Sequence, residues 1–331
     1  MSTITLYNDL EDFYKMALDT GNLCILTGNA NPDLAKKIAD HIGVNLCDAY
    51  VGHFNNGETQ VMISESIRGK DIFIIQPTSY PVNDNLMELL IMTDALKRAS
   101  CNSVTAVMPY YGYARQDRKA KARDPITSKL VANMMTAAGI DRVITMDLHA
   151  SQEQGFFDIP VDHMLGQPML TDYFKLKDLE NMVIVSPDHG SVTRARNMAK
   201  PFNVPIAIID KRRPEPNKSE IMNIIGEVEG KNCIILDDLI DTAGTICNAA
   251  KALDDLGANS VYACATHAVL SGPAIERIEA SPIKEMVLLN TIPIPEEKML
   301  KKFTVLSAGH IFAETISRVY SNKPISVMFN G

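Results

Sequence analysis

The sequence predicts an α/β protein built from open parallel β-sheets that are flanked by helices. Short apolar runs alternate along the chain with segments whose apolar residues recur at helical spacing. These runs are apolar throughout instead of alternating with polar residues, which is typical of strands covered on both faces. With 331 residues and 46% apolar content, the chain is long enough for about two such domains.

The first half of the chain contains four predicted strands and two clear helices between them. Pro32 stands in the first turn of the first helix, where backbone N–H groups have no acceptor within the helix and the missing N–H of proline costs no hydrogen bond. The strands are predicted at 22–28, 71–77, 103–111 and 142–150, and the helices at 31–43 and 84–100. The second half predicts strands at 182–190, 206–213, 232–238 and 261–269.

The two halves of the sequence contain similar stretches, which indicate an internal repeat. "GKDIFIIQP" from Gly69 parallels "GKNCIILDD" from Gly230, and in both copies a helix and then Asn-Ser-Val follow. Thr27 matches Ser186 at nearly the same separation. We therefore predict two copies of one α/β domain, although any two strand–helix–strand stretches share some likeness. The copies differ in chemistry, because the first has Gln76 and Pro77 where the second has two acids.

Composition excludes several classes of protein. A net charge of −8 argues against broad nucleic-acid binding, which needs a basic face. The N-terminal residues lack the basic and apolar regions of a signal peptide, and no run approaches the roughly 18 apolar residues of a membrane helix. The six cysteines form no C-x-x-C pair, so we expect buried free thiols in a reducing cytoplasm.

The stretch "CIILDDLIDTAGT" places Asp237, Asp238 and Asp241 after a strand and before a helix. Ligands of open α/β sheets gather at the carboxyl ends of the strands. The small residues from Thr242 to Thr245 let backbone N–H groups close around a phosphate at the start of the helix. Acids beside a phosphate are reasonable if they hold sugar hydroxyls or a cation. The alternative is an acidic surface turn that caps a helix.

This stretch resembles the phosphoribosyl-diphosphate-binding motif of the type I phosphoribosyltransferase fold. The resemblance implies that Asp237 and Asp238 hold ribose hydroxyls, and that the following loop binds the 5-phosphate. The residues implied in that loop are Asp241, Thr242, Ala243, Gly244 and Thr245. The motif by itself leaves two choices: a base phosphoribosyltransferase, or an enzyme that makes the diphosphate.

Other stretches favour the second choice. Five distinctive stretches occur between residues 83 and 214. In chain order they are "NDNLMELLIM", "PYYGYARQDRK", "TMDLHASQEQGFFDIPVDH", "VSPDHGSVTRAR" and "IIDKRRP". Together they resemble class I ribose-phosphate pyrophosphokinases. The resemblance implies two phosphoribosyltransferase-like domains: 1–165 with 306–331, which carries ATP and oligomer contacts, and 166–305, which carries the ribose 5-phosphate site and the catalytic loop. It also implies Mg²⁺, ATP as co-substrate, a cytoplasmic location, and a homohexamer made of three dimers.

The same resemblance assigns roles to further residues. Lys211 and Arg213 match the essential cations of a flexible catalytic loop, and His149 and Asp188 match positions linked to magnesium. The residues implied at ATP are Phe54, Asn56, Glu58, Arg115, Gln116, Arg118 and His149. Two positions depart from the common pattern: Asn56 replaces an aspartate, and Ser191 replaces a glycine. Because serine disfavours positive φ, we expect the turn at Ser191 to be shifted.

The resulting hypothesis is a magnesium-dependent transferase. It moves the β,γ-diphosphoryl group of ATP to the 1-hydroxyl of ribose 5-phosphate and releases AMP, as a step of nucleotide biosynthesis. Two alternatives remain. A base phosphoribosyltransferase would require a purine or pyrimidine acceptor, and a non-catalytic regulatory homologue would have lost the loop cations or the acidic turn.

Overall fold

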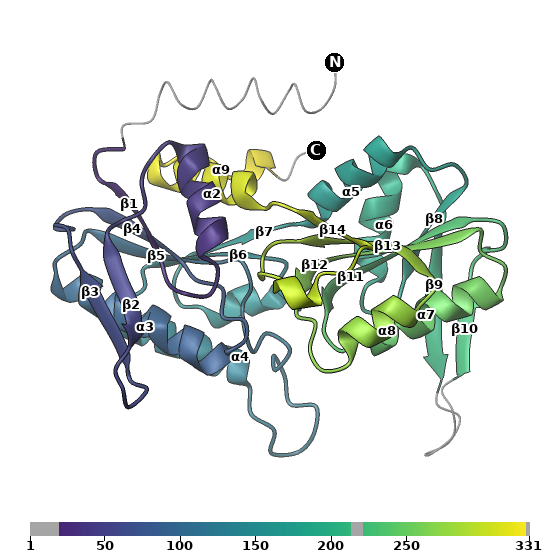
Figure 1. The fold of residues 1–331 in the computed structure, drawn as a ribbon, viewed down its shortest axis with the longest axis horizontal. Coiled ribbons are helices and arrows are strands. Elements are labelled where there is room, and N and C mark those ends of the chain that lie inside the picture. Colours follow the sequence, from purple (N-terminus) through teal and green to yellow (C-terminus); the bar gives the residue numbers. More distant parts are fainter. Residues whose placement is uncertain (1–19, 213–220, 329–331) are drawn as a thin grey trace. The chain divides into compact units, whose positions relative to one another are not determined.

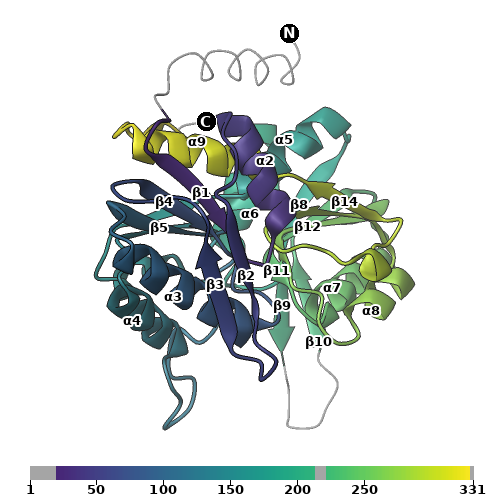
Figure 2. The same ribbon diagram turned by 60° about the vertical axis from the view of Figure 1, so that its left-hand side comes forward.

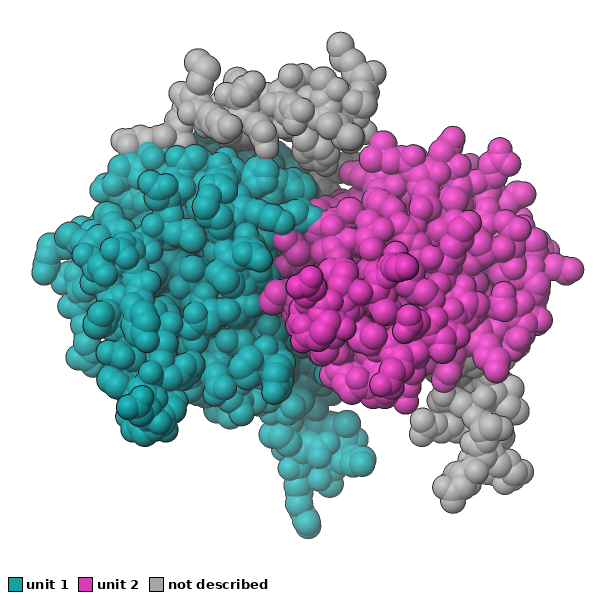
Figure 3. All heavy atoms as spheres, viewed as in Figure 1, with its two compact units in different colours: residues 1–164, 307–331 teal, residues 165–306 magenta. Residues whose placement is uncertain are grey.

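The structure is a computed structural model that describes residues 20–212 and 221–328, and it divides into two compact units (Figures 1 and 3). Unit 1 contains the chain through Met164 together with the segment from Ser307 onward, and unit 2 runs from Leu165 to Leu306. Each unit has a β-sheet with helices on both faces. The predicted fold class, α/β with parallel sheets flanked by helices, is confirmed.

Unit 1 contains a five-stranded parallel sheet in the order β1-β4-β5-β6-β7. Helices α2 and α9 cover one face, and α3 and α4 cover the other (Figure 1). Strands β2 and β3 form a separate antiparallel hairpin (Figure 2). The elements are β1 Leu23–Thr27, α2 Pro32–Ile42, β2 Ala49–His53, β3 Thr59–Ile63, β4 Asp71–Ile75, α3 Val82–Arg98, β5 Ser103–Met108, α4 Thr127–Ala138, β6 Arg142–Met146, β7 Val161–Met164 and α9 Gly309–Tyr320, with 3₁₀ turns at Ser151–Phe156 and Ser326–Met328.

Unit 2 contains a seven-stranded sheet in the order β10-β9-β8-β11-β12-β13-β14, parallel except for the β9–β10 pair. Helices α5 and α6 lie on one face, and α7 and α8 on the other (Figure 1). The elements are α5 Gln167–Lys177, β8 Met182–Ser186, α6 Val192–Ala199, β9 Ile206–Arg212, β10 Ile221–Ile225, β11 Asn232–Ile240, α7 Gly244–Asp255, β12 Ser260–Ala268, α8 Ala274–Ala280, β13 Ile283–Leu289 and β14 Phe303–Leu306, with 3₁₀ turns at Lys200–Phe202 and Glu296–Lys298.

The two sheets repeat one strand order. The order β1-β4-β5-β6-β7 in unit 1 corresponds to β8-β11-β12-β13-β14 in unit 2, with helices in equivalent places along the chain. The segments that match in sequence therefore occupy the same positions in the two sheets. This agreement supports the predicted repeat.

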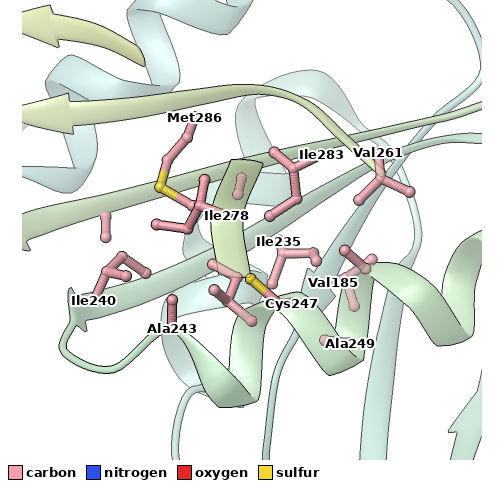
Figure 4. Close-up of a cluster of buried hydrophobic side chains, with 14 of the residues drawn as sticks. Val185, Ile235, Ile240, Ala243, Cys247, Ala249, Val261, Ile278, Ile283 and Met286 are labelled. Atoms are coloured by element: carbon pink, nitrogen blue, oxygen red, sulfur yellow. The ribbon is translucent and has the colours of Figure 1, made fainter. Parts of the chain in front are cut away.

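The core of unit 2 holds the candidate site in place. Apolar residues of β11 and β12, such as Ile235 and Val261, pack against buried residues of α7 and α8 (Figure 4). On α7 the buried Ile246, Ala249 and Leu253 recur at helical spacing, so one face of this helix is fixed to the sheet. The segment that begins α7 is therefore attached to a rigid element.

Two predictions from composition can be compared with the described residues. All six cysteines are free, and five of them are buried, as expected. None of the helices in residues 20–212 and 221–328 has both the length and the apolar content to cross a bilayer.

Candidate active site

The acidic turn of unit 2 lies on β11. The predicted strand was expected to end near Asp238, but β11 continues to Ile240 because its pairing with β12 extends that far. On the other side, pairing with β8 ends at the Ile235–Val185 pair. Asp237 and Asp238 therefore project past the end of one neighbouring strand, at the carboxyl edge of the sheet where ligands are expected.

The two acids are largely buried and lie close together. Asp238 is 5% exposed, and its backbone N–H donates to Asp237 Oδ1 at 2.9 Å. Burial and the adjacent Asp238 raise the pKa of Asp237 to about 8. The positive charge of Arg194 on α6 acts against this increase and lowers the pKa of Asp237. Its Nη1 lies 3.8 Å from Asp237 Oδ1 and 3.6 Å from Asp238 Oδ1. Sequence analysis did not single out Arg194, although it stands inside "VSPDHGSVTRAR".

The segment from Asp241 to Thr245, called here the phosphate loop, joins β11 to α7. Ala243 has φ 58°, a left-handed conformation, and its carbonyl accepts from Cys247 N at 3.0 Å as α7 begins. Successive backbone N–H groups in such a turn form a concave site for anions, and the helix dipole adds to it. The Asp241 carboxylate accepts a hydrogen bond from Ser271 Oγ.

A second turn follows β8 and approaches the acid pair. Ser191 N donates to Asp188 Oδ1 at 3.0 Å, and Ser191 Oγ donates to Asp237 Oδ1 at 3.4 Å. Ser191 has φ −90°, outside the left-handed region, so the serine causes no backbone strain in this turn. The expected shift of the turn stays a prediction, and the serine hydroxyl links the Asp188 turn to the acid pair.

The predicted catalytic cations lie at the edge of the described residues. The backbone of Lys211 is paired with Met222 in the antiparallel β9–β10 ladder, so this residue lies in the predicted strand 206–213 and not in the flexible loop that the resemblance implies. Arg213 lies outside the described residues. Beside this ladder, His189 Nε2 is 3.0 Å from Asp210 Oδ1.

In unit 1, three of the predicted ATP residues belong to the turn of the β2–β3 hairpin. Phe54 N donates to Glu58 O at 2.8 Å, and Asn56 Oδ1 accepts from Glu58 N at 3.2 Å. Asn56 therefore stabilises the turn through its own side chain. Phe54 is 50% exposed, so its ring is available for stacking on a base.

The other predicted ATP residues come from two connections at the carboxyl edge of the five-stranded sheet of unit 1. Arg115, Gln116 and Arg118 lie in turns between β5 and α4, and His149 follows β6; all four side chains are exposed. Gln116 Oε1 accepts from Thr127 Oγ1 at 2.5 Å, which ties the first connection to the start of α4.

A buried carboxyl that sequence analysis missed joins these two connections. Glu153 is fully buried, accepting from Ser128 Oγ at 2.6 Å and from Ala150 N at 2.9 Å. Ser128 also donates its N–H to Gln116 O at 3.3 Å, and its carbonyl accepts from Tyr111. Burial raises the pKa of Glu153. Glu153 stands inside "TMDLHASQEQGFFDIPVDH", but the motif does not reveal its role, because its partner Ser128 lies 25 positions away.

The first copy has a closed polar network where the second copy has its acids. Gln76 is fully buried, and its Nε2 donates to Glu88 Oε2 at 2.9 Å while its Oε1 accepts from Ala30 N at 3.2 Å. Glu88 also accepts from Asn29 N at 3.0 Å and from Asn29 Nδ2 at 2.7 Å. Protein groups therefore fill this position, and the assignment of this part of the active site to the second copy stays a prediction.

The metal-binding groups near His149 and Asp188 decide whether these two residues fit a magnesium ion. Within residues 20–212 and 221–328, no three His, Cys, Asp or Glu side chains converge to hold a metal ion. His149 belongs to unit 1 and Asp188 to unit 2. Mg²⁺ is commonly bound by one or two carboxylates together with water and substrate phosphates. A single carboxylate such as that of Asp188 therefore fits an ion whose other ligands are water and the phosphates of the substrate.

Comparison with known proteins gives consistent matches over most of the chain. Residues 23–139 match the family described as the N-terminal domain of ribose phosphate pyrophosphokinase, and residues 212–330 match the phosphoribosyl synthetase-associated domain. The chain is 61% identical to a ribose-phosphate pyrophosphokinase of Caldanaerobacter subterraneus subsp. tengcongensis over 95% of its length and 100% of the relative. It is 59% identical to that of Bacillus subtilis, over 93% and 98%.

A solved structure agrees with these matches. The phosphoribosylpyrophosphate synthetase from Mycobacterium smegmatis superposes with a TM-score of 0.87 at 44% identity, covering 91% of this chain and 99% of that one.

Proposed function

The chain belongs to the ribose-phosphate pyrophosphokinase family, and from that premise we propose how its two units share the reaction. The proposed substrates are ATP and ribose 5-phosphate. The β,γ-diphosphoryl group moves to the sugar 1-hydroxyl, which gives 5-phospho-α-D-ribose 1-diphosphate and AMP for nucleotide biosynthesis. The observation that supports the sugar site most strongly is the buried acid pair beside an anion-binding turn at one edge of the unit 2 sheet.

Unit 2 holds the acceptor in this proposal. Asp237 and Asp238 accept hydrogen bonds from ribose hydroxyls, while the phosphate loop surrounds the 5-phosphate with N–H groups. Arg194 offsets part of the charge of the acid pair before the sugar arrives. This arrangement fixes the sugar, so its 1-hydroxyl is presented in line with the β-phosphorus of ATP.

Unit 1 supplies the proposed ATP contacts. Phe54 stacks on the adenine, and Asn56 and Glu58 offer polar groups beside it. Arg115, Gln116 and Arg118 donate hydrogen bonds suited to phosphates and nucleotide edges, and His149 contacts the triphosphate. In unit 2, Lys211 and Arg213 are proposed to stabilise the charge that develops on the leaving oxygens.

Asp188 of unit 2 and His149 of unit 1 are each proposed as a magnesium contact, acting with the substrate phosphates. When bound, magnesium would neutralise triphosphate charge and orient the β- and γ-phosphates. The loose transition state of phosphoryl-type transfer places little demand on a general base, so none is assigned among the residues of this chain.

We further propose that the protein acts in the cytoplasm as a homohexamer of three dimers, in which the turn Phe54–Glu58 completes the ATP site of a neighbouring subunit. No nucleic acid or membrane partner is proposed, in keeping with the net charge of −8.

The decisive experiment is incubation of the purified protein with ATP, Mg²⁺ and ribose 5-phosphate. We expect AMP to appear one-for-one with a diphosphorylated sugar. A requirement for a purine or pyrimidine acceptor would identify a base phosphoribosyltransferase instead, and binding of both substrates without any turnover would identify a regulatory homologue.

A further inference from the structure

We infer that the segment from Leu270 to Arg277, called here the clamp, holds the phosphate loop in the conformation that binds ribose 5-phosphate, with Ser271 and Arg277 as its positioning residues. The clamp follows β12 and leads into α8 in unit 2. The inference rests on the proposed sugar site and assigns that site two further residues. Neither residue belongs to the motif that predicted the loop.

Ser271 fixes the first residue of the phosphate loop at two points. Its N–H donates to Asp241 O at 3.0 Å, and its Oγ donates to Asp241 Oδ1. The preceding N–H, that of Leu270, donates to Ile240 O at 2.9 Å. Both the backbone and the carboxylate of Asp241 are therefore held by the clamp, so this carboxylate orients the loop through Ser271.

Arg277 fixes the next peptide group. Its Nη1 donates to Thr242 O at 3.0 Å. The same atom lies 3.3 Å from the point where a Cβ on Gly244 would stand, so a side chain at Gly244 would press against the guanidinium. The positive charge of Arg277 is thus placed beside the middle of the loop.

These contacts set the direction of the N–H groups that face a ligand. In a trans peptide, the N–H of one residue points away from the C=O of the residue before it. When Asp241 O and Thr242 O accept bonds from the clamp, the N–H groups of Thr242 and Ala243 are turned to the opposite side. A phosphate is attracted by N–H groups and repelled by carbonyl oxygens, so the clamp selects the peptide orientations suited to an anion.

The clamp itself is attached to rigid structure. Ala274 and Ile278 are fully buried, and Ile278 packs in the core shown in Figure 4. Inside the clamp, Leu270 O accepts a hydrogen bond from Lys298 Nζ at 3.0 Å. This support matters because movement of the clamp would allow the phosphate loop to move as well.

The first arm of the test compares Ser271→Ala, Ser271→Thr and a matched control, Ser281→Ala. Ser281 lies just after the other end of α8, where its Oγ donates to Ile278 O at 2.7 Å. We expect Ser271→Ala to raise the KM for ribose 5-phosphate about tenfold, since a hydrogen bond to a charged carboxylate is lost. The KM for ATP should stay unchanged, Ser271→Thr should restore most of the affinity, and Ser281→Ala should behave as the wild type.

The second arm compares Arg277→Met with Arg277→Lys, using calorimetric titration with ribose 5-phosphate. The methionine variant should bind the sugar phosphate several-fold more weakly, and the lysine variant should recover part of that loss because it keeps a charged donor. Equal rises of both substrates' KM in Ser271→Ala, or unchanged sugar binding in both Ser271→Ala and Arg277→Met, would overturn the inference.

A third variant separates this inference from the proposed sugar site. If Asp238→Asn leaves ribose 5-phosphate binding intact, the site itself is misplaced and the clamp inference falls with it. If Asp238→Asn weakens that binding while Ser271→Ala and Arg277→Met do not, the site stands and only the clamp inference is wrong.

Discussion

Arg194 Nη1 lies 3.6 Å from Asp238 Oδ1, and the same nitrogen lies 3.8 Å from Asp237 Oδ1, so one guanidinium serves two neighbouring carboxylates. The side chain of Arg194 is largely buried, at 22% exposure, as are those of the two acids. A cation in this position lowers the cost of keeping the pair ionised before a ligand binds.

The first prediction concerns this cation. Arg194→Met should shift the acidic limb of the pH profile of kcat/KM for ribose 5-phosphate by about one unit toward higher pH, because the acids lose an opposite charge. The matched control is Arg196→Met, which removes an exposed arginine from the same helix. A shift of equal size in both variants would mean that general charge, and not the contact with the acid pair, sets the profile.

The second prediction concerns stability and pH. The folded-state pKa of Asp237 is raised from 3.8 to about 8, chiefly by burial and then by Asp238. Between these values the folded state binds the proton more tightly than the unfolded state, so the contribution of Asp237 to stability falls as the pH rises through this window. Asp237→Asn does not titrate. The free energy of unfolding of the wild type, relative to that of Asp237→Asn, should therefore decrease from pH 4 to pH 8 in urea titrations. A pH-independent difference would contradict the assigned shift.

The third prediction compares the two copies. Asp238→Asn should weaken ribose 5-phosphate binding, whereas Gln76→Ala should leave the KM for this substrate nearly unchanged. Gln76→Ala should instead lower the free energy of unfolding by about 1–3 kcal/mol, because Glu88 and the Ala30 N–H each lose a buried partner. Sugar-binding losses of equal size in the two variants would show that the first copy also carries a sugar site.

The fourth prediction concerns the buried Glu153–Ser128 hydrogen bond of 2.6 Å. Glu153→Leu alone should destabilise the protein by about 1–3 kcal/mol, because the Ser128 hydroxyl and the Ala150 N–H are left without this partner. The double variant with Ser128→Ala should be less destabilised than the sum of the single variants, since both polar partners are then removed. Chemical denaturation of all four proteins measures this coupling, and strict additivity would show that the two side chains do not depend on each other.

The fifth prediction tests the shared site. Glu58→Ala and Lys211→Ala should each be nearly inactive alone, since one removes a proposed ATP contact and the other a proposed transition-state cation. When the two are co-expressed, mixed oligomers should regain a fraction of the activity, because some interfaces pair an intact hairpin turn with an intact Lys211. Mixed oligomers that form but remain as inactive as the parents would rule out sharing between subunits.

Much of the fold follows from local patterns in the sequence. Continuous apolar runs predicted the central strands, and apolar residues at helical spacing predicted α2 and α3. The matching strings from Gly69 and Gly230 predicted two copies of one α/β domain, and the structure has one strand order in both sheets. The phosphate loop was also predictable, because a strand, two acids and a row of small residues stand side by side in the chain.

Contacts between distant segments were decided only by the tertiary structure. Arg194 meets the acid pair because α6 follows β8, the strand next to β11, and Ser271 meets Asp241 because β12 is the strand on the other side. The length of β11 depended on the same neighbours, since pairing with β12 carried it past Asp238. Strand order and register are set by packing over the whole domain, so a single sequence does not show which distant side chains will meet. The residues that form the loop were therefore visible in the sequence, and the residues that hold it were not.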